Sequence, residues 1–556
     1  MRTLHVELPV SPEAPPRDAS VPLREAVAAA AGVPLDDLGD VRIERRSLDA
    51  RAGRRPRWVL KCAYTTRDEQ PLPDELPELL RPRHLATPIT GLHPIIVGSG
   101  PAGLFAALQF ADFGVPTTLI ERGAEVGRRN LHIRDLRVQG VLDDESNLCF
   151  GEGGAGTYSD GKLYTRGKSV RVREVYERLV ALGIDRRILV EAHPHVGTNR
   201  LIPMMPKLRE RLREAGHTLR FDAKVVDLVR DRGDGRVVGV RLASGEEIVG
   251  GPVLLATGHS ARDVYTMLAR LGVAMERKDF AIGARIEHPQ ELVDHAQLGA
   301  MAGWPSVGAA EYFVSAQVPT LAGVRGAYSF CMCPGGIVLP TPTRQGHLNV
   351  NGMSNEGRNS GIANAALVVQ VGEQEMFLDR PGDLDDDPEF GAHVAGGALL
   401  GVALQGKLER RAFEVGGGSY RAPAERLLQT VGQRASGEAL PKSTYRPGLT
   451  PAPASQVLPT RVLNVMRDAA RIIERRQLRG YLSDDALLLP VETTTSAPVR
   501  VLRGQDRQST THPGLYPCAE GAGYAGGIVS SAIDGMRSAL AVLAARGLVD
   551  AAEVER

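Results

Sequence analysis

Hydrophobic and polar positions in the first 88 residues follow two periods. Alternation over 4–8 predicts a strand, and helical spacing of apolar residues over 23–31 predicts a helix. Two further alternating runs, 41–45 and 58–64, predict paired strands. The order strand, helix, strand, strand predicts a small α+β domain over residues 1–88.

Two polar stretches interrupt this first pattern. The basic loop at 51–57 is compatible with two interpretations: a dock for an anion or acidic partner, and a solvated hairpin tip. The proline-rich stretch at 71–83 predicts a linker.

The most informative pattern begins beyond the linker. An apolar strand over 94–97 enters a glycine-rich turn, and a helix starting at Leu104 follows. A second strand over 117–120 ends at Glu121. Strand, Gly-x-Gly-x-x-Gly, helix, strand and acid occur in the order of a dinucleotide-binding βαβ unit.

Each position of this turn has a physical role in such a unit. Gly98 permits the tight turn, Gly100 lets the backbone approach a pyrophosphate, and Gly103 lets helix and strand pack closely. The helix N-terminus offers free N–H groups to the phosphates, and Glu121 accepts hydrogen bonds from a ribose.

The remaining chain predicts a discontinuous core. A strand series over 219–258 closes on Thr257-Gly258, as a strand returning under the nucleotide would. We expect an α/β fold with a three-layer Rossmann-like core over 89–261 and 481–556. Residues 262–480, which mix glycine- and proline-rich loops with short strands and helices, form the predicted substrate domain. The acidic tract at 379–389 is predicted to be a solvated loop.

Composition excludes several function classes. The formal net charge is +1, which gives no long-range attraction to nucleic acid or an anionic membrane. We see no signal peptide, no membrane-length apolar run and no metal-like Cys/His spacing, and five cysteines do not make a disulfide framework. We therefore expect a reduced, cytoplasmic protein without a metal.

A second glycine-rich segment spans 149–163. Its glycines would let backbone amides crowd against a ligand, and Thr157, Ser159 and Lys162 add donors. The alternative is a plain flexible loop.

A third glycine-rich segment lies near the C-terminus. A strand over 515–519 meets the turn Glu520-Gly521, and a helix starts near Gly526. The first amides of that helix would stabilise an anion. The alternative is a helix–sheet turn without a ligand.

These three segments resemble the FAD-binding elements of two-dinucleotide-binding-domain flavoproteins. The whole chain is similar to a bacterial family of predicted FAD-dependent dehydrogenases. The segments that carry the similarity are 46–51, 156–163, 193–198, 330–336 and 351–354. Glu520 stands where Asp is usual, which implies a longer reach with the same hydrogen bonds.

The resemblance implies FAD as cofactor. The implied contacts are Gly98, Ser99, Gly100, Pro101, Ala102, Gly103, Glu121, Arg122, Arg129, Gly154, Gly156, Thr157, Ser159, Gly161, Lys162, Leu163, Lys224, Val225, Thr257, Gly258, Glu520, Gly521, Gly526, Gly527 and Ile528.

Candidate catalytic residues follow from side-chain chemistry. Cys331 and Cys333 could exchange electrons with a flavin or supply a nucleophile; the alternative is a turn with buried cysteines. Arg500, with Arg503 beside it, could bind a substrate carboxylate or form a surface ion pair.

Two histidines have a similar pair of interpretations. His193 and His195 could act as acid and base. Otherwise they lead into a helix that is capped by Thr198 or Asn199.

Two functions remain from the sequence. The first is an FAD-dependent oxidoreductase that transfers a hydride between flavin and a small molecule. It would use NAD(P)H at most as a transient reductant, because no second Gly-x-Gly-x-x-Gly lies between a strand and a helix. The second is a flavin-containing RNA-modification or partner-binding protein that recruits a macromolecule through its N-terminal domain, against which the near-zero net charge argues.

Overall fold

The computed structural model describes residues 2–50, 55–73, 77–83, 91–165, 167, 169–321, 323–372, 397–437 and 439–555. Part of the basic loop (51–54), parts of the proposed linker (74–76) and the acidic tract at 379–389 lie outside the described residues. In the described residues, no helix has both the length and the hydropathy needed to cross a membrane.

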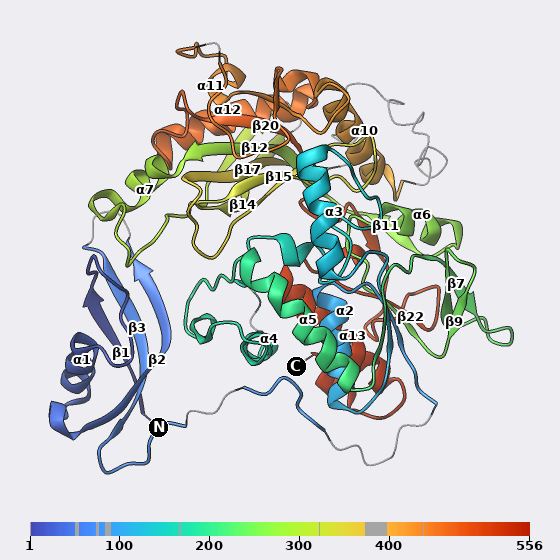
Figure 1. Ribbon diagram of the computed structural model, residues 1–556, viewed down its shortest axis with the longest axis horizontal. Coiled ribbons are helices and arrows are strands. Elements are labelled where there is room, and N and C mark those ends of the chain that lie inside the picture. The colour runs from blue at the N-terminus through green and yellow to red at the C-terminus, as the bar shows by residue number, and fades with distance from the viewer. Residues whose placement is uncertain are drawn as a thin grey trace.

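The N-terminal unit has the predicted α+β order. Strands β1 (Arg2–Pro9), β2 (Leu38–Asp49) and β3 (Arg57–Thr66) form an antiparallel sheet in the order β1-β3-β2. Helix α1 (Val21–Ala31) packs on it through Leu23 and Val27. This unit lies to one side of the molecule in Figure 1.

A five-stranded parallel sheet carries the predicted βαβ unit. Its order is β22-β10-β4-β5-β6, and all neighbours are parallel. The strands are β4 (Ile95–Val97), β5 (Thr118–Ile120), β6 (Thr218–Arg220), β10 (Val253–Leu255) and β22 (Leu515–Pro517).

Different layers cover the two faces of this sheet, which gives three layers in all. Side chains such as Ile96 and Leu254 pack against helices on one face. Those helices are α2 (Pro101–Asp112), α3 (Val126–Gln139), α4 (Arg171–Ala181), α5 (Thr198–Glu214) and α13 (Ile528–Ala544). The opposite face packs on α6 (Arg262–Arg270) and on the antiparallel strands β7 (Val225–Arg230), β8 (Val237–Leu242) and β9 (Glu247–Val249). The predicted strand series over 219–258 is therefore divided between two sheets.

A seven-stranded mixed sheet forms the upper part of Figure 1, in the order β13-β14-β17-β12-β20-β18-β19. Its strands are β12 (Phe280–Pro289), β13 (Ser315–Thr320), β14 (Gly323–Cys333), β17 (Ile362–Val371), β18 (Ala422–Arg426), β19 (Leu449–Pro451) and β20 (Leu487–Glu492). Its core also contains residues of α7 (Gln290–Leu298), α10 (Leu400–Val415), α11 (Leu427–Thr430) and α12 (Thr460–Arg476).

Short elements complete the described chain. They are the antiparallel pairs β11 (Met275–Arg277) with β21 (Val499–Val501) and β15 (Ile337–Pro340) with β16 (Val350–Met353), and helix α14 (Ala551–Glu555).

Two sequence expectations about the mixed sheet need correction. Strands β12, β14 and β17 have 10 or 11 residues and are not short. The segment after residue 481 does not return at once to the parallel sheet, because β20 first pairs with β12. We therefore propose that the second part of the nucleotide core starts after β20.

Candidate functional site

The three glycine-rich segments meet in one cleft. Residues of 98–102, 154–159 and 519–531 all line it, together with 256–261 at the end of β10. A Cβ built on Gly154 would lie 2.9 Å from Cα of Gly100. A Cβ on Gly156 would lie 3.3 Å from Pro101 and 3.4 Å from Ile528. The first two segments therefore touch through their backbones, and the second touches the third through the side chain of Ile528, although more than 350 residues separate those two.

Two helices point their N-termini into this cleft. Pro101 and Ala102 of α2 line it, as do Gly527 and Ile528 at the start of α13. Among the described residues, the amides of Ala102 and Ile528 donate to no protein acceptor. Free amides and the positive end of the helix dipole favour anions. The cleft thus has the donor set that a pyrophosphate requires.

Gly100 has open space beside it. A Cβ there would meet only Gly154, at 3.9 Å. Its φ of −73° is one that any residue adopts. A side chain at this position would therefore occupy the cleft and not the protein interior.

Glu121 has a different immediate role from the predicted one. Its carboxylate accepts hydrogen bonds from the amide of Ser99 (2.9 Å), the hydroxyl of Ser99 (2.8 Å) and the amides of Gly123 and Gly151 (3.0 Å each). These bonds join the first glycine turn to the second. Glu121 also lines the cleft, so its predicted ribose contact stays a prediction.

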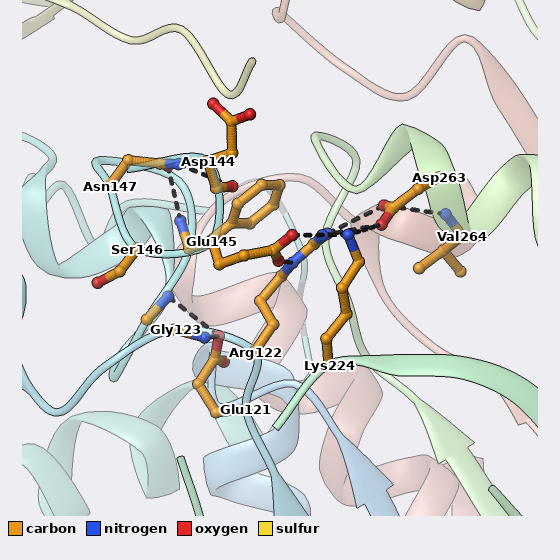
Figure 2. Close-up of polar contacts among 12 residues, drawn as sticks. Glu121, Arg122, Gly123, Asp144, Glu145, Ser146, Asn147, Lys224, Asp263 and Val264 are labelled. Carbon is orange, nitrogen blue, oxygen red and sulfur yellow. Dashed lines mark hydrogen bonds and ion pairs between the residues drawn. The ribbon is translucent and has the colours of Figure 1, made fainter. Parts of the chain in front are cut away.

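Four charged side chains form a ring of ion pairs, as Figure 2 shows, and two of them, Arg122 and Lys224, line the cleft. Arg122 donates to Glu145 (2.6 Å) and to both oxygens of Asp263 (2.9 and 2.8 Å). The ammonium of Lys224 lies 2.6 Å from Glu145 and 3.1 Å from Asp263. Burial opposes the charge of Arg122, but its hydrogen bonds to the two carboxylates outweigh burial and raise its pKa. The part of the cleft that Arg122 and Lys224 line is called here the charged end.

Arg129, a predicted cofactor contact, shapes the second glycine segment instead. It is fully buried and does not line the cleft. Its guanidinium donates to the main-chain carbonyls of Asn147, Leu148, Gly151, Glu152 and Gly154 at 2.7–3.2 Å. The correction has a simple cause: five carbonyls point inward in this loop, and one guanidinium satisfies them.

The predicted contacts divide into two groups. Those that line the cleft are Gly98, Gly100, Pro101, Ala102, Glu121, Arg122, Gly154, Gly156, Ser159, Lys224, Val225, Thr257, Gly258, Glu520, Gly527, Ile528 and the candidate Cys331. Those that do not are Ser99, Gly103, Arg129, Thr157, Gly161, Lys162, Leu163, Gly521, Gly526, Cys333 and Arg500.

Packing explains most of the second group. Gly103 lies against the carbonyl of Gly98, which is the close helix–strand contact that its position predicts. A Cβ on Gly161 would lie 2.8 Å from the amide of Gly197, and one on Gly521 would lie 2.7 Å from the carbonyl of Gly258. These glycines allow close backbone contact between segments of the protein.

Burial of the side chain explains why other predicted cofactor contacts do not line the cleft. Leu163 is fully buried in the core beneath α4 and α5, and Thr157 is buried as well. The carboxylate of Glu520 lies beside Gly526, where a Cβ would be 3.2 Å from it.

Another part of the lining, called here the cysteine end, comes from the mixed sheet and its hairpin and contains Cys331. Cys331 lies at a bulge in β14, between Phe330 and Cys333, with φ of 46°. Its carbonyl accepts hydrogen bonds from Arg285 (2.8 Å) and from the thiol of Cys333 (3.3 Å). A non-glycine residue at positive φ is strained, and such strain gathers at functional sites.

The surroundings of Cys331 favour its thiolate. A hydrogen bond from Cys333 lowers the pKa of the Cys331 thiol, and the charges of Arg285 and Lys162 lower it further against the opposing effect of burial. Cys333 is completely buried, and its own pKa is raised. Of the two cysteines, Cys331 is therefore the reactive candidate.

A buried ion pair supports this end from beneath. Arg285 of β12 donates to Glu492 of β20 at 2.7 and 3.0 Å, and both side chains are 0% exposed. Arg285 also donates to Asn351, which lines the cleft beside Cys331.

Lys162 and His195 meet behind the cysteine loop. Lys162 donates to the carbonyl of Met332 and lies 3.4 Å from Asp160. His195 Nε2 lies 3.0 Å from Asp160. Burial would raise the pKa of Asp160, but His195, Lys162 and Ser354 lower it to about 2. Neither Lys162 nor His195 lines the cleft, so both act on it only through neighbours.

The structure also places three other predicted features: Arg500, His193 and the N-terminal cap of α5. Arg500 is 41% exposed and pairs with Glu276 at 3.1 Å, away from the cleft, so the surface ion pair is the correct interpretation. His193 stacks on Tyr164 with ring centroids 4.6 Å apart. Helix α5 begins at Thr198 with Gly197 in the cap position, so the predicted cap at Thr198 or Asn199 is wrong.

His259 is a cleft residue that the sequence analysis missed. Its Nδ1 lies 3.6 Å from Glu520, and its Nε2 lies 3.1 Å from the carbonyl of Thr494. Burial opposes protonation, but Glu520 raises the pKa of His259. Its position directly after Thr257-Gly258 was the available signal.

Comparison with known proteins shows two matching families and one relative that covers most of the chain. Residues 279–495 match the family described as FAD-dependent protein, C-terminal domain-like, and residues 2–64 match a domain of unknown function, DUF8436. A Clostridium beijerinckii protein described as uncharacterized is 38% identical over 449 residues, which are 80% of each chain.

The solved structures that the chain matches are distant from it in sequence. The halogenase PltM is 10% identical with a TM-score of 0.35, and the match covers 84% of this chain and 73% of that chain. CtdE in complex with FAD is 10% identical with a TM-score of 0.31, over 84% of this chain and 92% of that chain. Aquifex aeolicus GidA is 13% identical with a TM-score of 0.30, over 82% of this chain and 64% of that chain.

Proposed function

Because this chain belongs to the family of FAD-dependent proteins, we propose that it binds FAD in the cleft and transfers a hydride between the flavin and a small-molecule substrate. The observation that carries this proposal is the convergence of two helix N-termini and three glycine-rich segments in one cleft that Cys331 also lines.

Different residues of the cleft would contact different parts of FAD. The pyrophosphate would lie at the N-terminus of α2, beside Gly100 and Gly154. The adenosine would lie toward the charged end, near Glu121 and Arg122. The flavin would lie toward the N-terminus of α13 and the cysteine end.

The cofactor supplies the two-electron chemistry, and the protein supplies position and electrostatics. The amides at Gly527 and Ile528, together with the α13 dipole, favour negative charge that develops beside them. The mixed sheet and its neighbouring hairpin contribute Cys331 of β14 and Asn351 and Gly352 of β16 to the lining of the cleft.

Cys331 is the residue that we propose to act on the substrate. The lowered pKa of Cys331 favours its thiolate, which can take a proton from the substrate or attack an electrophilic carbon. Cys333, Arg285 and Lys162 are positioning residues, because they act through Cys331. His259 Nδ1, beside Glu520, can exchange a second proton.

Anaerobic rapid mixing of the FAD-loaded protein with NADH and with NADPH tests this function. Bleaching of the flavin absorbance by either would identify the reductant. If neither bleaches it, the substrate itself or a protein donor has this role, and screening of small-molecule reductants continues from there. A folded protein that takes up no FAD would overturn the proposal.

A further inference from the structure

A second cavity adjoins the cysteine end of the cleft. It has a volume of about 430 Å³ and lies between α3, the start of α5 and the hairpin of β15 and β16. Figure 1 shows α3 between the mixed sheet and the helices of the parallel sheet. The lining residues are Asn130, Ile133, Arg134, Arg137, Val138, Leu148, Tyr158, Thr198, Asn199, Ile202, Leu339, Met353, Asn355 and Arg446.

The lining contains three arginines and no acidic residue. Arg134 is neutralised by Asp135, which it contacts at 3.0 Å. Arg137 and Arg446 form no ion pair with any described residue. The buried Nε of Arg137 has no hydrogen-bond partner.

The positive charges of Arg137 and Arg446 repel each other. Burial lowers the pKa of Arg137, and the charge of Arg446 lowers it further. Most buried or half-buried arginines of this chain have carboxylate partners, as Arg122 and Arg285 do. Arg446 is exposed and Arg137 is half-buried, so of the two it is the guanidinium of Arg137 that lacks both a carboxylate partner and full hydration. An anion in the cavity would supply that partner.

A helix end adds to this positive potential. Thr198 and Asn199 form the first turn of the 17-residue helix α5, and both line the cavity. The partial positive charge of a helix N-terminus acts over its first turn.

Apolar side chains line the part of the cavity between the arginines and the cleft. Leu148, Tyr158 and Leu339 line both the cavity and the cleft. Ile133, Ile202 and Met353 extend the apolar wall toward the arginines. A molecule that fills the cavity would thus have an anionic end and an apolar body directed at the cysteine end.

We propose that this cavity binds the carboxylate of an organic acid whose apolar body reaches into the cleft beside Cys331. The proposal rests on the proposed function, since it names the class of substrate for that site. The planar fork of a guanidinium matches a carboxylate, or a phosphate, in two parallel hydrogen bonds. The apolar wall of Ile133, Ile202 and Met353 is what favours an organic acid over inorganic phosphate.

Calorimetric titration of the FAD-loaded protein with octanoate, octanol and inorganic phosphate tests the proposal. We expect octanoate to bind, with octanol and phosphate each at least about tenfold weaker. Replacing Arg137 by Gln should weaken octanoate about 10- to 100-fold, the range for one charge-assisted hydrogen bond or two. Arg446→Gln should act in the same direction, and Arg137→Lys should recover part of the loss.

The matched control is Arg128→Gln. Arg128 lies on the same helix, pairs with Asp222 at 2.9 Å and does not line the cavity, so octanoate affinity should stay unchanged. Arg137→Gln should also leave the melting temperature unchanged or raise it, because it removes a repulsion. A structural arginine would lower it.

The outcomes separate this site from the cofactor proposal. Octanoate binding to a protein that takes up no FAD would retain the cavity and reject the oxidoreductase. FAD uptake without octanoate binding would reject the cavity as an acid site. Equal affinity for octanol, tighter binding of phosphate, or an unchanged affinity in both arginine variants would also overturn the proposal.

Discussion

The two ends of the cleft are built from different materials. The α2 turn and the charged end are formed by main-chain amides, glycines and a closed ring of four charges. At the cysteine end, side chains from β12, β14, β16 and β20 meet, and the ion pair of Arg285 and Glu492 lies beneath them. A backbone site depends on which residues leave space, whereas a side-chain site depends on which residues are present. The two ends should therefore fail under different substitutions.

Gly100→Val should have the largest effect on the backbone end. A Cβ there meets only Cα of Gly154, at an ordinary contact distance of 3.9 Å, so the new side chain would project into the cleft, and we expect a folded protein that retains no FAD. The ratio of flavin to protein absorbance after purification measures this. The control is Gly127→Val in the first turn of α3, where a Cβ meets nothing within 4 Å, and that variant should stay yellow. A yellow Gly100→Val protein would refute the placement of the phosphates.

Glu492→Gln should have the next largest effect, at the side-chain end. It leaves the guanidinium of Arg285 buried without its counter-charge, which costs about 3–5 kcal/mol in the free energy of unfolding. Urea unfolding of the FAD-loaded protein measures it. Glu276→Gln is the matched control, since its partner Arg500 is exposed, and it should cost less than about 1 kcal/mol. Equal costs would contradict the buried pair's importance.

The reactivity of Cys331 should depend on pH in a defined direction. Because its pKa lies below the ordinary thiol value, alkylation by iodoacetamide should already be fast at neutral pH. Cys333→Ala removes the hydrogen bond that stabilises the Cys331 thiolate most, so the inflection of the rate should move to higher pH. Labelling at neutral pH should slow about tenfold for each unit by which the pKa then exceeds 7. Mass spectrometry of the labelled peptide follows the rate. An inflection near pH 9 in the unaltered protein would reject the thiolate.

Glu145→Gln should have the smallest effect. Glu145 is 40% exposed, so breaking its bonds to Arg122 and Lys224 should change FAD affinity only by the roughly 0.2–1 kcal/mol of an exposed pair. Titration of FAD into the cofactor-free protein at low and high salt measures the change. A loss of about 100-fold would show that the ring of charges grips the cofactor directly.

The same contrast explains what could be predicted from the sequence. Backbone sites need glycines, and glycine spacing is visible in a single chain. The helix predicted to start at Leu104 begins three residues earlier, at Pro101, and the helix predicted to start near Gly526 begins two residues later, at Ile528. The meeting of three distant segments followed from the resemblance to one kind of cofactor site.

The side-chain end could not be predicted in this way. Strand β12 contains Arg285, Glu287 and His288, which break the apolar pattern of a strand, yet all three are at most 1% exposed. Each is buried because it finds a partner far along the chain: Glu492, Thr444 and the carbonyl of Tyr481. Such pairing is a property of the folded topology.

The role of Arg129 was misjudged for the same reason, and Glu121 has an additional role that the sequence does not show. Arg129 and Glu121 have the residue types of ligand contacts, but their donors and acceptors are largely used by main-chain groups of the loop at 147–154 and the turn at Ser99. Only coordinates reveal that competition between protein and ligand partners.

Identification of the flavin released from the purified protein tests the central claim most directly. The chain would be purified, its visible spectrum recorded, and the cofactor released by denaturation and weighed by mass spectrometry. We predict FAD at one molecule per chain, held without a covalent bond. A correctly folded protein that is colourless and takes up no added FAD, or one that releases FMN in its place, would contradict the account.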